Sequence, residues 1–297
     1  MTDVSARPMG AALLPDRHAV RSRFADAQRS FGEGWLGVAR GSDGSSRLSD
    51  LRQSGCARLR LPRLRSVRPS NRLLDAVAIN TGGGLTGGDR LHWRVDVGAG
   101  ATASVTSQAC ERLYRAHEGH AQVHIDLVVE AGGTLLWWPQ ETIAFDGAAM
   151  RRRLEARVDE GATLLVVEAM QLGRAAMGET VKQASLRDRW HVRNGASALI
   201  HAEALRIDGA RDLNGPAGTG GRTAFATVLL VAPDAARHLA EARAILGPDG
   251  AASCWEACSS ERLLARIAAP SSYALRRRLV PLAALLAGRD VPRGWSL

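Results

Sequence analysis

Short apolar runs with polar residues at alternate positions fill the first two thirds of the chain. The pattern is clear in LLDAVAIN (73–80) and RLHWRVDV (90–97), where β-branched and aromatic residues are frequent. A period of two residues is typical of β-strands that bury one face. We therefore predict a mainly β fold up to about residue 226.

Four segments in this region resemble one another. They are VDVGAGATASVTSQ, VVEAGGTLLWWPQE, RVDEGATLLVVEA and HVRNGASALIHAE, and each has an apolar strand, a turn that starts with glycine and a second apolar strand. The turn glycines are Gly100, Gly132, Gly161 and Gly195, which are 32, 29 and 34 residues apart. Recurrence at this spacing is typical of stacked supersecondary units. We expect a β-helix-like stack of strand-turn-strand repeats, with a sandwich of successive hairpins as the alternative.

The pattern changes near residue 226, and two C-terminal α-helices are predicted in the remaining chain. The first spans 234–246, with Asp234 as its N-cap and Gly247 just past its end. The second spans 271–287, where leucines recur along one stripe. Pro281 lies inside this second helix and should kink or interrupt it.

The N-terminal residues differ from the rest of the chain. Residues 1–33 are rich in Arg, Ala and Asp without periodicity, so we expect a mobile extension, followed by a single domain over 34–297. No run of about 20 apolar residues occurs, which argues against a membrane span. The start also lacks the apolar stretch of a secretory signal. These features predict a cytoplasmic protein that does not interact with a membrane.

The formal net charge of +9 first suggests a nucleic-acid partner. Lys182 is the only lysine, however, and acidic residues are interspersed among the arginines. We therefore interpret the arginine triplets at 151–153 and 276–278 as solvated faces and expect no nucleic-acid partner. Cysteines are too few for a disulfide framework. Cys254 and Cys258 could hold a metal, but no further pair completes a zinc set.

The glycine-rich loop NTGGGLTGGD (80–89) contains the spacing G-x-G-x-x-G. A dinucleotide-binding loop needs a helix after the motif, and here the alternating pattern predicts a strand instead. No Lys-Ser/Thr follows the last glycine, so a P-loop is also excluded. We predict a structural loop whose glycines permit positive φ and close backbone contacts, namely Gly82, Gly83, Gly84, Gly87 and Gly88.

Side chains with a carboxylate or amide group recur seven or eight residues after the four turn glycines, within or just after strongly apolar strands. Glu168 and Glu203 lie at such positions, and His201 shares a strand face with Glu203. A carboxylate in an apolar run needs a partner or a cation. Asp89 could join them if the glycine loop packs nearby. Asp89, Glu168, His201 and Glu203 are therefore candidates for a weak site for a divalent first-row metal. A satisfied hydrogen-bond column is the alternative.

A second cluster of histidines occurs in HEGHAQVH (117–124). His120 and His124 share a strand face and His117 does not, so we expect this cluster to face solvent. No nucleophile elbow, H-E-x-x-H motif or close carboxylate pair with divided acid and base roles is found. These observations favour a binding or assembly protein, and we expect no catalytic residues and no enzymatic activity.

Five motifs occur in the order that a known family shows. They are TGGGLTGGD (81–89), TSQACERLYR (106–115), LLWWPQETIAFDGA (135–148), LGRAAMGE (172–179) and VPRGWSL (291–297). On these motifs the chain, from about Gly34 onward, resembles the UreD (UreH) family of urease accessory proteins. The segment SGCARLRL (54–61) departs from the Gly-Pro-Leu common in the family, and the residues before Gly34 have no family counterpart.

The resemblance implies a scaffold that assists nickel insertion into apo-urease. Such proteins act with UreF and the GTPase UreG, and UreE delivers the nickel. The family fold implied is an unusual β-helical arrangement with two helices. The resemblance further implies transient passage of nickel(II) through an internal acidic path, with no tightly bound cofactor, and Asp89, Glu168 and Glu203 match acidic positions on that path. A β-solenoid enzyme or an arginine-rich binding module is the alternative.

Overall fold

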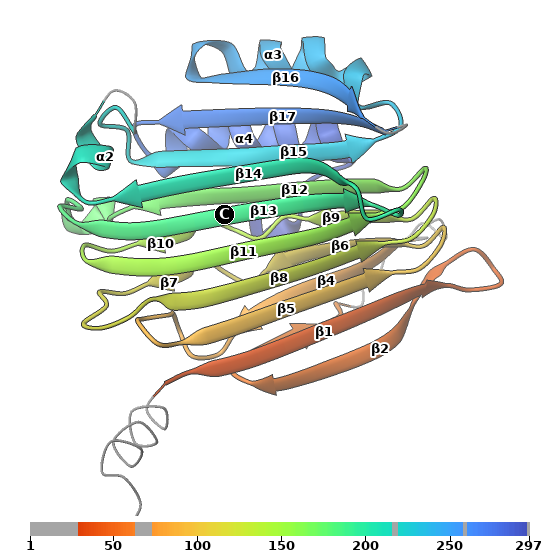
Figure 1. The fold of residues 1–297 in the computed structure, drawn as a ribbon, viewed down its shortest axis with the longest axis horizontal. Coiled ribbons are helices and arrows are strands. Elements are labelled where there is room, and N and C mark those ends of the chain that lie inside the picture. Colours follow the sequence, from red (N-terminus) through yellow and green to blue (C-terminus); the bar gives the residue numbers. More distant parts are fainter. Residues whose placement is uncertain (1–28, 63–72, 216–218, 258–259, 296–297) are drawn as a thin grey trace, which may run out of the picture.

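The computed structural model describes residues 29–62, 73–215, 219–257 and 260–295. Its strands form two large sheets that face each other, and most helical residues lie near the C-terminal end of the chain (Figure 1). Residues 1–28 of the expected N-terminal extension lie outside the described part. The first strand already begins at Phe31, so 31–33 belong to the folded body.

The first sheet has seven strands in the order β14-β13-β11-β8-β5-β1-β2. Their bounds are β1 Phe31–Arg40, β2 Ser46–Gly55, β5 Arg90–Val97, β8 Ala121–Val129, β11 Ala148–Val158, β13 Ala184–Asn194 and β14 Leu199–Asp208. The second sheet has ten strands, with β16-β17-β15-β12-β9-β6-β4-β3 in order and β10 and β7 extending from β12. Their bounds are β3 Ala57–Arg60, β4 Leu73–Asn80, β6 Thr102–Ser107, β7 Glu111–Leu113, β9 Thr134–Trp137, β10 Thr142–Ala144, β12 Thr163–Leu172, β15 Ala224–Ala232, β16 Gly250–Ala257 and β17 Ser260–Ala269.

The chain coils between the two sheets. From β4 to β13 it alternates between the ten-stranded and the seven-stranded sheet, so each coil contributes a strand to both. Neighbours in the central part of each sheet are parallel and one coil apart, as in β5, β8, β11 and β13. The stack is visible in Figure 1 as strands layered from β1 upward. This solenoid-like arrangement confirms the predicted mainly β, β-helix-like fold.

The turns of successive coils also stack. Gly100, Gly132 and Gly161 have φ of 63°, 64° and 68°, a region that glycine enters without steric cost. The amide of Gly100 donates to the carbonyl of Ala131 at 3.0 Å, which links two turns directly. Three of the four sequence repeats are therefore true coils.

The fourth repeat differs from the other three. Its turn joins β13 to β14, which are antiparallel neighbours in the same sheet. The residue with positive φ there is Ser197, at 64°, rather than Gly195. This turn is thus a hairpin that ends the stack, so the fourth strand-turn-strand repeat is not a further coil.

Two apolar cores separate three layers. The first core lies between the sheets and is formed by the inward positions of the coils. The second lies between the ten-stranded sheet and the helices α3 Leu239–Leu246 and α4 Ser272–Ala287. The leucine stripe of α4 fills this second core, with Leu275, Leu279 and Leu282 at most 1% exposed. The stripe therefore serves ordinary core packing.

Both predicted C-terminal helices are present, with differences in detail. The first is divided into a 3-10 turn, η2 Ala235–His238, followed by α3. The second begins after Ser271, whose Oγ accepts a hydrogen bond from the amide of Ala274 at 3.2 Å, and ends at Gly288. Pro281 does not interrupt α4, because buried leucines before and after it hold both halves against the sheet.

The remaining helical elements are short. They are η1 Ala175–Met177, α2 Ala210–Asn214, η3 Gly247–Asp249 and η4 Arg293–Trp295. The sequence pattern did not predict α2, which follows β14 directly. Within the described residues, none of the helices has both the length and the apolar character needed to cross a bilayer.

The glycine loop joins β4 to β5, strand to strand as the alternation predicted. Gly83, Gly84 and Gly88 have positive φ, at 76°, 148° and 91°. Gly87 has an ordinary φ but lies against backbone, since a Cβ there would be 1.9 Å from the carbonyl oxygen of Glu118. The loop geometry therefore excludes a side chain at Gly87 on steric grounds alone.

Replacing Gly87 with alanine should destabilise the protein by about 1–3 kcal/mol, because a rigid backbone carbonyl occupies the position of the new methyl group. Gly82→Ala is a matched control, since a Cβ at Gly82 would meet only side-chain atoms, the nearest of them oxygens at 3.1 and 3.3 Å. Urea denaturation of both variants measures the difference. Equal loss in the two variants would contradict the steric explanation.

Candidate functional site

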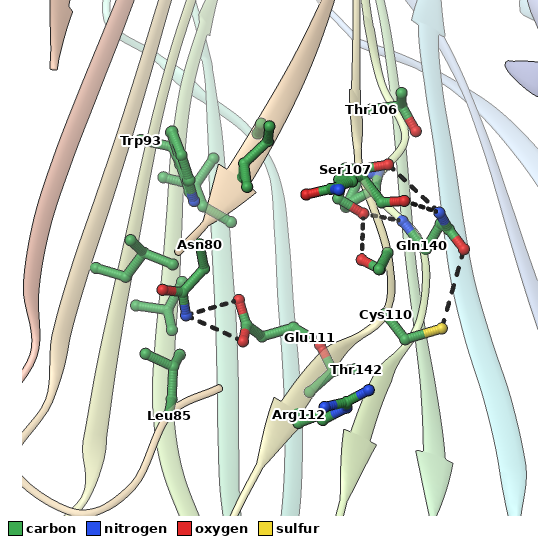
Figure 2. A pocket seen from close by; sticks show the side chains of 18 of the residues that line it. Asn80, Leu85, Trp93, Thr106, Ser107, Cys110, Glu111, Arg112, Gln140 and Thr142 are labelled. Atoms are coloured by element: carbon green, nitrogen blue, oxygen red, sulfur yellow. Dashed lines mark hydrogen bonds between the residues drawn. The ribbon is translucent and has the colours of Figure 1, made fainter. Parts of the chain in front are cut away.

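A chamber of about 270 Å³ lies between the two sheets. Apolar side chains form part of its wall, including those of Leu85, Trp93, Val105, Ile125, Trp137 and Met150. Its polar lining consists of Asn80, Thr106, Ser107, Gln108, Cys110, Glu111, Arg112, Gln140, Thr142, Arg152 and Glu168. Figure 2 shows Asn80 and Glu111 on one side of this space and Gln140 with Ser107 and Cys110 on the other. The chamber thus combines several oxygen donors with an apolar shell.

A buried cluster of charges lies at the chamber wall. Arg152 of β11 contacts the carboxylate of Glu168 on β12 and, at 2.5 Å, that of Asp188 on β13. All three side chains are at most 8% exposed. Because β12 belongs to the other sheet, the guanidinium connects the two sheets across the core. We refer to Arg152, Glu168 and Asp188 as the buried triad.

Two tryptophans donate further hydrogen bonds to the carboxylates of the triad, whereas Nε of Arg152 is buried without a partner among the described residues. The indole of Trp137 donates to Glu168 at 2.9 Å, and that of Trp190 donates to Asp188 at 3.0 Å. Burial raises the pKa of Glu168, and the adjacent guanidinium of Arg152 opposes that shift. When both carboxylates are ionised, the triad carries one net negative charge.

Arg152 corrects the interpretation of the arginine triplet at 151–153. Arg151 and Arg153 are exposed, but Arg152 is 6% exposed. Alternation along β11 places Arg152 on the same side as the buried Met150 and Leu154. The alternation of apolar and polar residues over 148–158 was enough to predict that Arg152 points inward, so the interpretation of all three arginines as solvated was wrong.

Glu111 is the chamber carboxylate that makes no ion pair among the described residues, although the charge of the adjacent Arg112 favours its ionised form. Its oxygens accept hydrogen bonds from the side-chain amide of Asn80, at 3.1 and 3.3 Å. Burial raises the pKa of Glu111 to about 7, although the hydrogen bond from Asn80 opposes the shift. Near neutral pH this group therefore exists in both protonation states, and an entering cation would favour the ionised one.

Cys110 supplies the thiol of the chamber. Burial raises its pKa to about 11, and the nearby carboxylate of Glu141 adds to the shift. Glu141 in turn accepts two hydrogen bonds of 2.6 Å from Arg276 of α4. Since the thiolate is the form that binds metals tightly, a thiol that stays protonated at neutral pH is a weak ligand.

Arg276 shows that the second arginine triplet is not simply solvated either. Beside its contacts with Glu141, it donates to the carbonyl of Trp295 at 3.0 Å, and so ties α4 to the C-terminal turn. Arg278 donates to Asp249 at 3.0 Å, and Arg277 alone in the triplet is exposed. Two of the three arginines therefore connect structural elements.

Asp89 holds the glycine loop in place. It is 4% exposed, and its two carboxylate oxygens accept hydrogen bonds from the backbone amides of Ser30 and Thr86, both at 2.8 Å. It does not line the chamber. The carboxylate is thus committed to fixing the loop against the start of β1.

His201 and Glu203 share the inward face of β14, as the sequence predicted. Glu203 accepts a hydrogen bond of 2.5 Å from Arg266 of β17. His201 is 6% exposed and lies against Trp255, with ring centroids 5.9 Å apart. Burial lowers the pKa of His201, so its imidazole is neutral near pH 7. Neither residue lines the chamber.

The structure therefore separates the four candidate metal-path residues. Glu168 lies at the chamber, His201 and Glu203 lie together on β14, and Asp89 lies under the loop. Over the described ranges, no three His, Cys, Asp or Glu side chains are grouped in a way that could hold a metal ion. Any cation in the chamber would meet a sparse set of donors.

The weaker candidates lie elsewhere. His117 and His124 are exposed, and His120 is half-buried with its Nε2 3.4 Å from Ser185 Oγ. Cys254 is half-buried, and Cys258 lies outside the described residues. Glu111 could not be predicted from the sequence, because β7 Glu111–Leu113 is only three residues long and shows no alternation of apolar and polar residues.

Comparison with known proteins gives a consistent result. The sequence profile of the family described as UreD urease accessory protein matches residues 31–296. Proteins named Urease accessory protein UreD from Brucella suis and Mesorhizobium japonicum are 48% and 49% identical, and each match covers 91% of this chain and 95% of the relative. Urease accessory protein UreD 1 of Brucella anthropi is 44% identical with the same coverage. These names describe accessory proteins rather than enzymes. The chain belongs to the UreD family of urease accessory proteins.

Proposed function

We propose that this chain is a cytoplasmic scaffold for urease maturation. It binds UreF, UreG and apo-urease, and nickel(II) brought by UreE passes through the chamber between the sheets on its way to urease. Membership of the UreD family supports the maturation role. The chamber supports the proposed nickel route, because it is a space lined by oxygen donors next to the apolar core between the two sheets.

The proposed nickel route rests mainly on the charge environment of Glu111. Arg152 is already balanced by two carboxylates, whereas Glu111 makes no ion pair among the described residues, and the neighbouring charge of Arg112 only partly opposes the effect of burial on it. A largely desolvated carboxylate without an ion-pair partner attracts a cation, since the ion relieves the cost of desolvating the charge. Glu111 is thus the residue at which a divalent cation would replace a proton.

A nickel route must bind its cargo loosely. The chamber offers one available carboxylate, amide and hydroxyl oxygens and a protonated thiol. Thiolate or multiple histidine ligands would hold a late first-row ion far more tightly. The donor set therefore suits passage rather than storage. Hydrolysis of GTP is assigned to UreG, and the glycine loop of this chain has the geometry of a strand-to-strand connection.

The test is nickel transfer in a reconstituted system with UreF, UreG, UreE, GTP and apo-urease. Glu111→Gln keeps the size of the side chain and one oxygen that accepts from the Asn80 amide but cannot ionise, so nickel incorporated per urease should fall several-fold. Glu118→Gln makes the same chemical change at an exposed loop position and should leave transfer unchanged. If Glu111→Gln supports maturation at the wild-type rate, the chamber is not the route.

A further inference from the structure

Arginines lie directly opposite one another on the outer face of the seven-stranded sheet. In the parallel pairing of β11 with β13, Arg151 is opposite Arg187, Arg153 opposite Arg189, and Arg157 opposite Arg193. On the next strand, β14, Arg206 is opposite Arg187. The three strands are adjacent in the sheet (Figure 1). We call these seven side chains the arginine face: Arg151, Arg153, Arg157, Arg187, Arg189, Arg193 and Arg206.

The arginine face is not neutralised by its own surroundings. The outward positions of β11, β13 and β14 carry two carboxylates, Glu155 and Asp208. Glu155 is shared between Arg153 at 2.5 Å and His191 at 2.9 Å. Asp208 is shared in the same way, between Arg206 at 2.9 Å and Arg187 at 3.9 Å. Arg157 pairs with Asp159, which follows β11, at 3.4 Å. Seven arginines thus face three carboxylates, and a positive excess remains.

Three arginines of this face make no ion pair with any carboxylate that the structure describes. They are Arg151, Arg189 and Arg193, and all three are exposed; Arg193 donates only to the backbone carbonyl of Ser197. Like charges directly opposite on neighbouring strands destabilise a sheet. The isolated chain therefore keeps an arrangement that weakens its own fold, which is expected where a partner supplies the missing negative charge.

We propose that the arginine face binds an acidic protein surface within the urease maturation assembly, which rests on the function proposed above. Arginine suits this role because its planar guanidinium binds a carboxylate through two parallel hydrogen bonds. The opposed pairs present several such groups on a flat sheet, so one acidic surface can contact many of them at once.

The surroundings of the face favour a protein over a nucleic acid or an anionic membrane. The neighbouring strands β8 and β5 place Asp126 and Asp96 on the same outer side, paired with His92 and Arg94, so the charge beyond the face is mixed in sign rather than uniformly positive. A protein surface can match such a mixed pattern of charges. The outward positions of β11, β13 and β14 also carry no Trp, Tyr or Phe on which bases could stack.

The test is the affinity of the full chain for apo-urease and for the UreF–UreG complex, each measured by biolayer interferometry. Arg151→Glu with Arg189→Glu should weaken binding to at least one of them by about tenfold or more. The wild-type affinity should also fall steeply between about 50 and 300 mM salt. The control variant, Arg40→Glu with Arg222→Glu, makes the same change in charge at two exposed arginines outside the face and should bind like the wild type.

A thermal melt separates lost binding from lost folding. Arg189→Glu places a carboxylate opposite Arg153, so the midpoint of unfolding should rise by about 1–3 °C rather than fall. Unchanged affinity of the face variant for both proteins would overturn the inference. So would a variant that loses only binding to a 20-base-pair DNA duplex or to phosphatidylserine vesicles. A wild-type chain that binds neither protein would overturn the proposed function together with this inference.

Discussion

Arg152→Met should lower the free energy of unfolding by about 3–5 kcal/mol, the largest loss expected from a single substitution in this chain. The substitution keeps most of the side-chain volume but leaves Glu168 and Asp188 buried without their cation. Those two side chains are only 4% and 8% exposed, so solvent compensates poorly for the loss of the guanidinium. Each carboxylate then either remains charged in the core or takes up a proton, and both outcomes cost free energy. Urea denaturation at pH 7 measures the effect.

Two controls show whether the unbalanced charge is the cause. Arg153→Met removes the exposed neighbour of Arg152 and should change the free energy of unfolding by less than about 0.5 kcal/mol. The triple variant R152M/E168Q/D188N removes all three charges and keeps acceptors for both tryptophan indoles, so it should recover much of the loss. If the triple variant is as unstable as Arg152→Met, the loss comes from packing and not from charge.

The alternation of apolar and polar residues was enough to predict the main features of the fold. It identified strands such as 73–80 and 90–97, and the glycine turns predicted the coils that connect the sheets. It could not distinguish the turn at Gly195 from the others, because a hairpin and a crossover both favour glycine and small polar residues. The choice between them depends on which strands are already paired, a tertiary effect.

The candidate site was predicted only in part. Glu168 could be found because a carboxylate in the run LLVVEA is costly without a partner. Its partner Arg152 was wrongly interpreted as part of a solvated face, although the alternation along 148–158 places it on the same side as Met150 and Leu154. For Asp89 and Glu203 the deciding contacts are Ser30 and Arg266, which are 59 and 63 residues away in the chain. Contacts over such distances leave no local pattern, so the roles of these carboxylates could not be read from the sequence.

Glu111→Gln should remove a fall in stability that the wild type shows as the pH rises. The folded-state pKa of Glu111 is about 7, raised by burial from an ordinary value of 4.5. Below pH 4.5 the carboxyl is protonated in both the folded and the unfolded chain, and its full contribution to stability is present. As the pH rises toward 7, the unfolded chain releases the proton first, so unfolding becomes easier. By about pH 8 the wild type should have lost about 2–3 kcal/mol relative to Glu111→Gln.

Denaturant unfolding of both proteins between about pH 4 and 8 measures this difference, because all other titrating groups are common to both. Glu118→Gln, at an exposed position, should follow the wild-type curve throughout. Added nickel(II) should restore stability to the wild type above pH 7, where Glu111 is ionised, and should have less effect on Glu111→Gln. Parallel curves for wild type and Glu111→Gln would mean that the carboxylate is already neutralised within the fold. A chamber of that kind would have no charge to offer a passing cation.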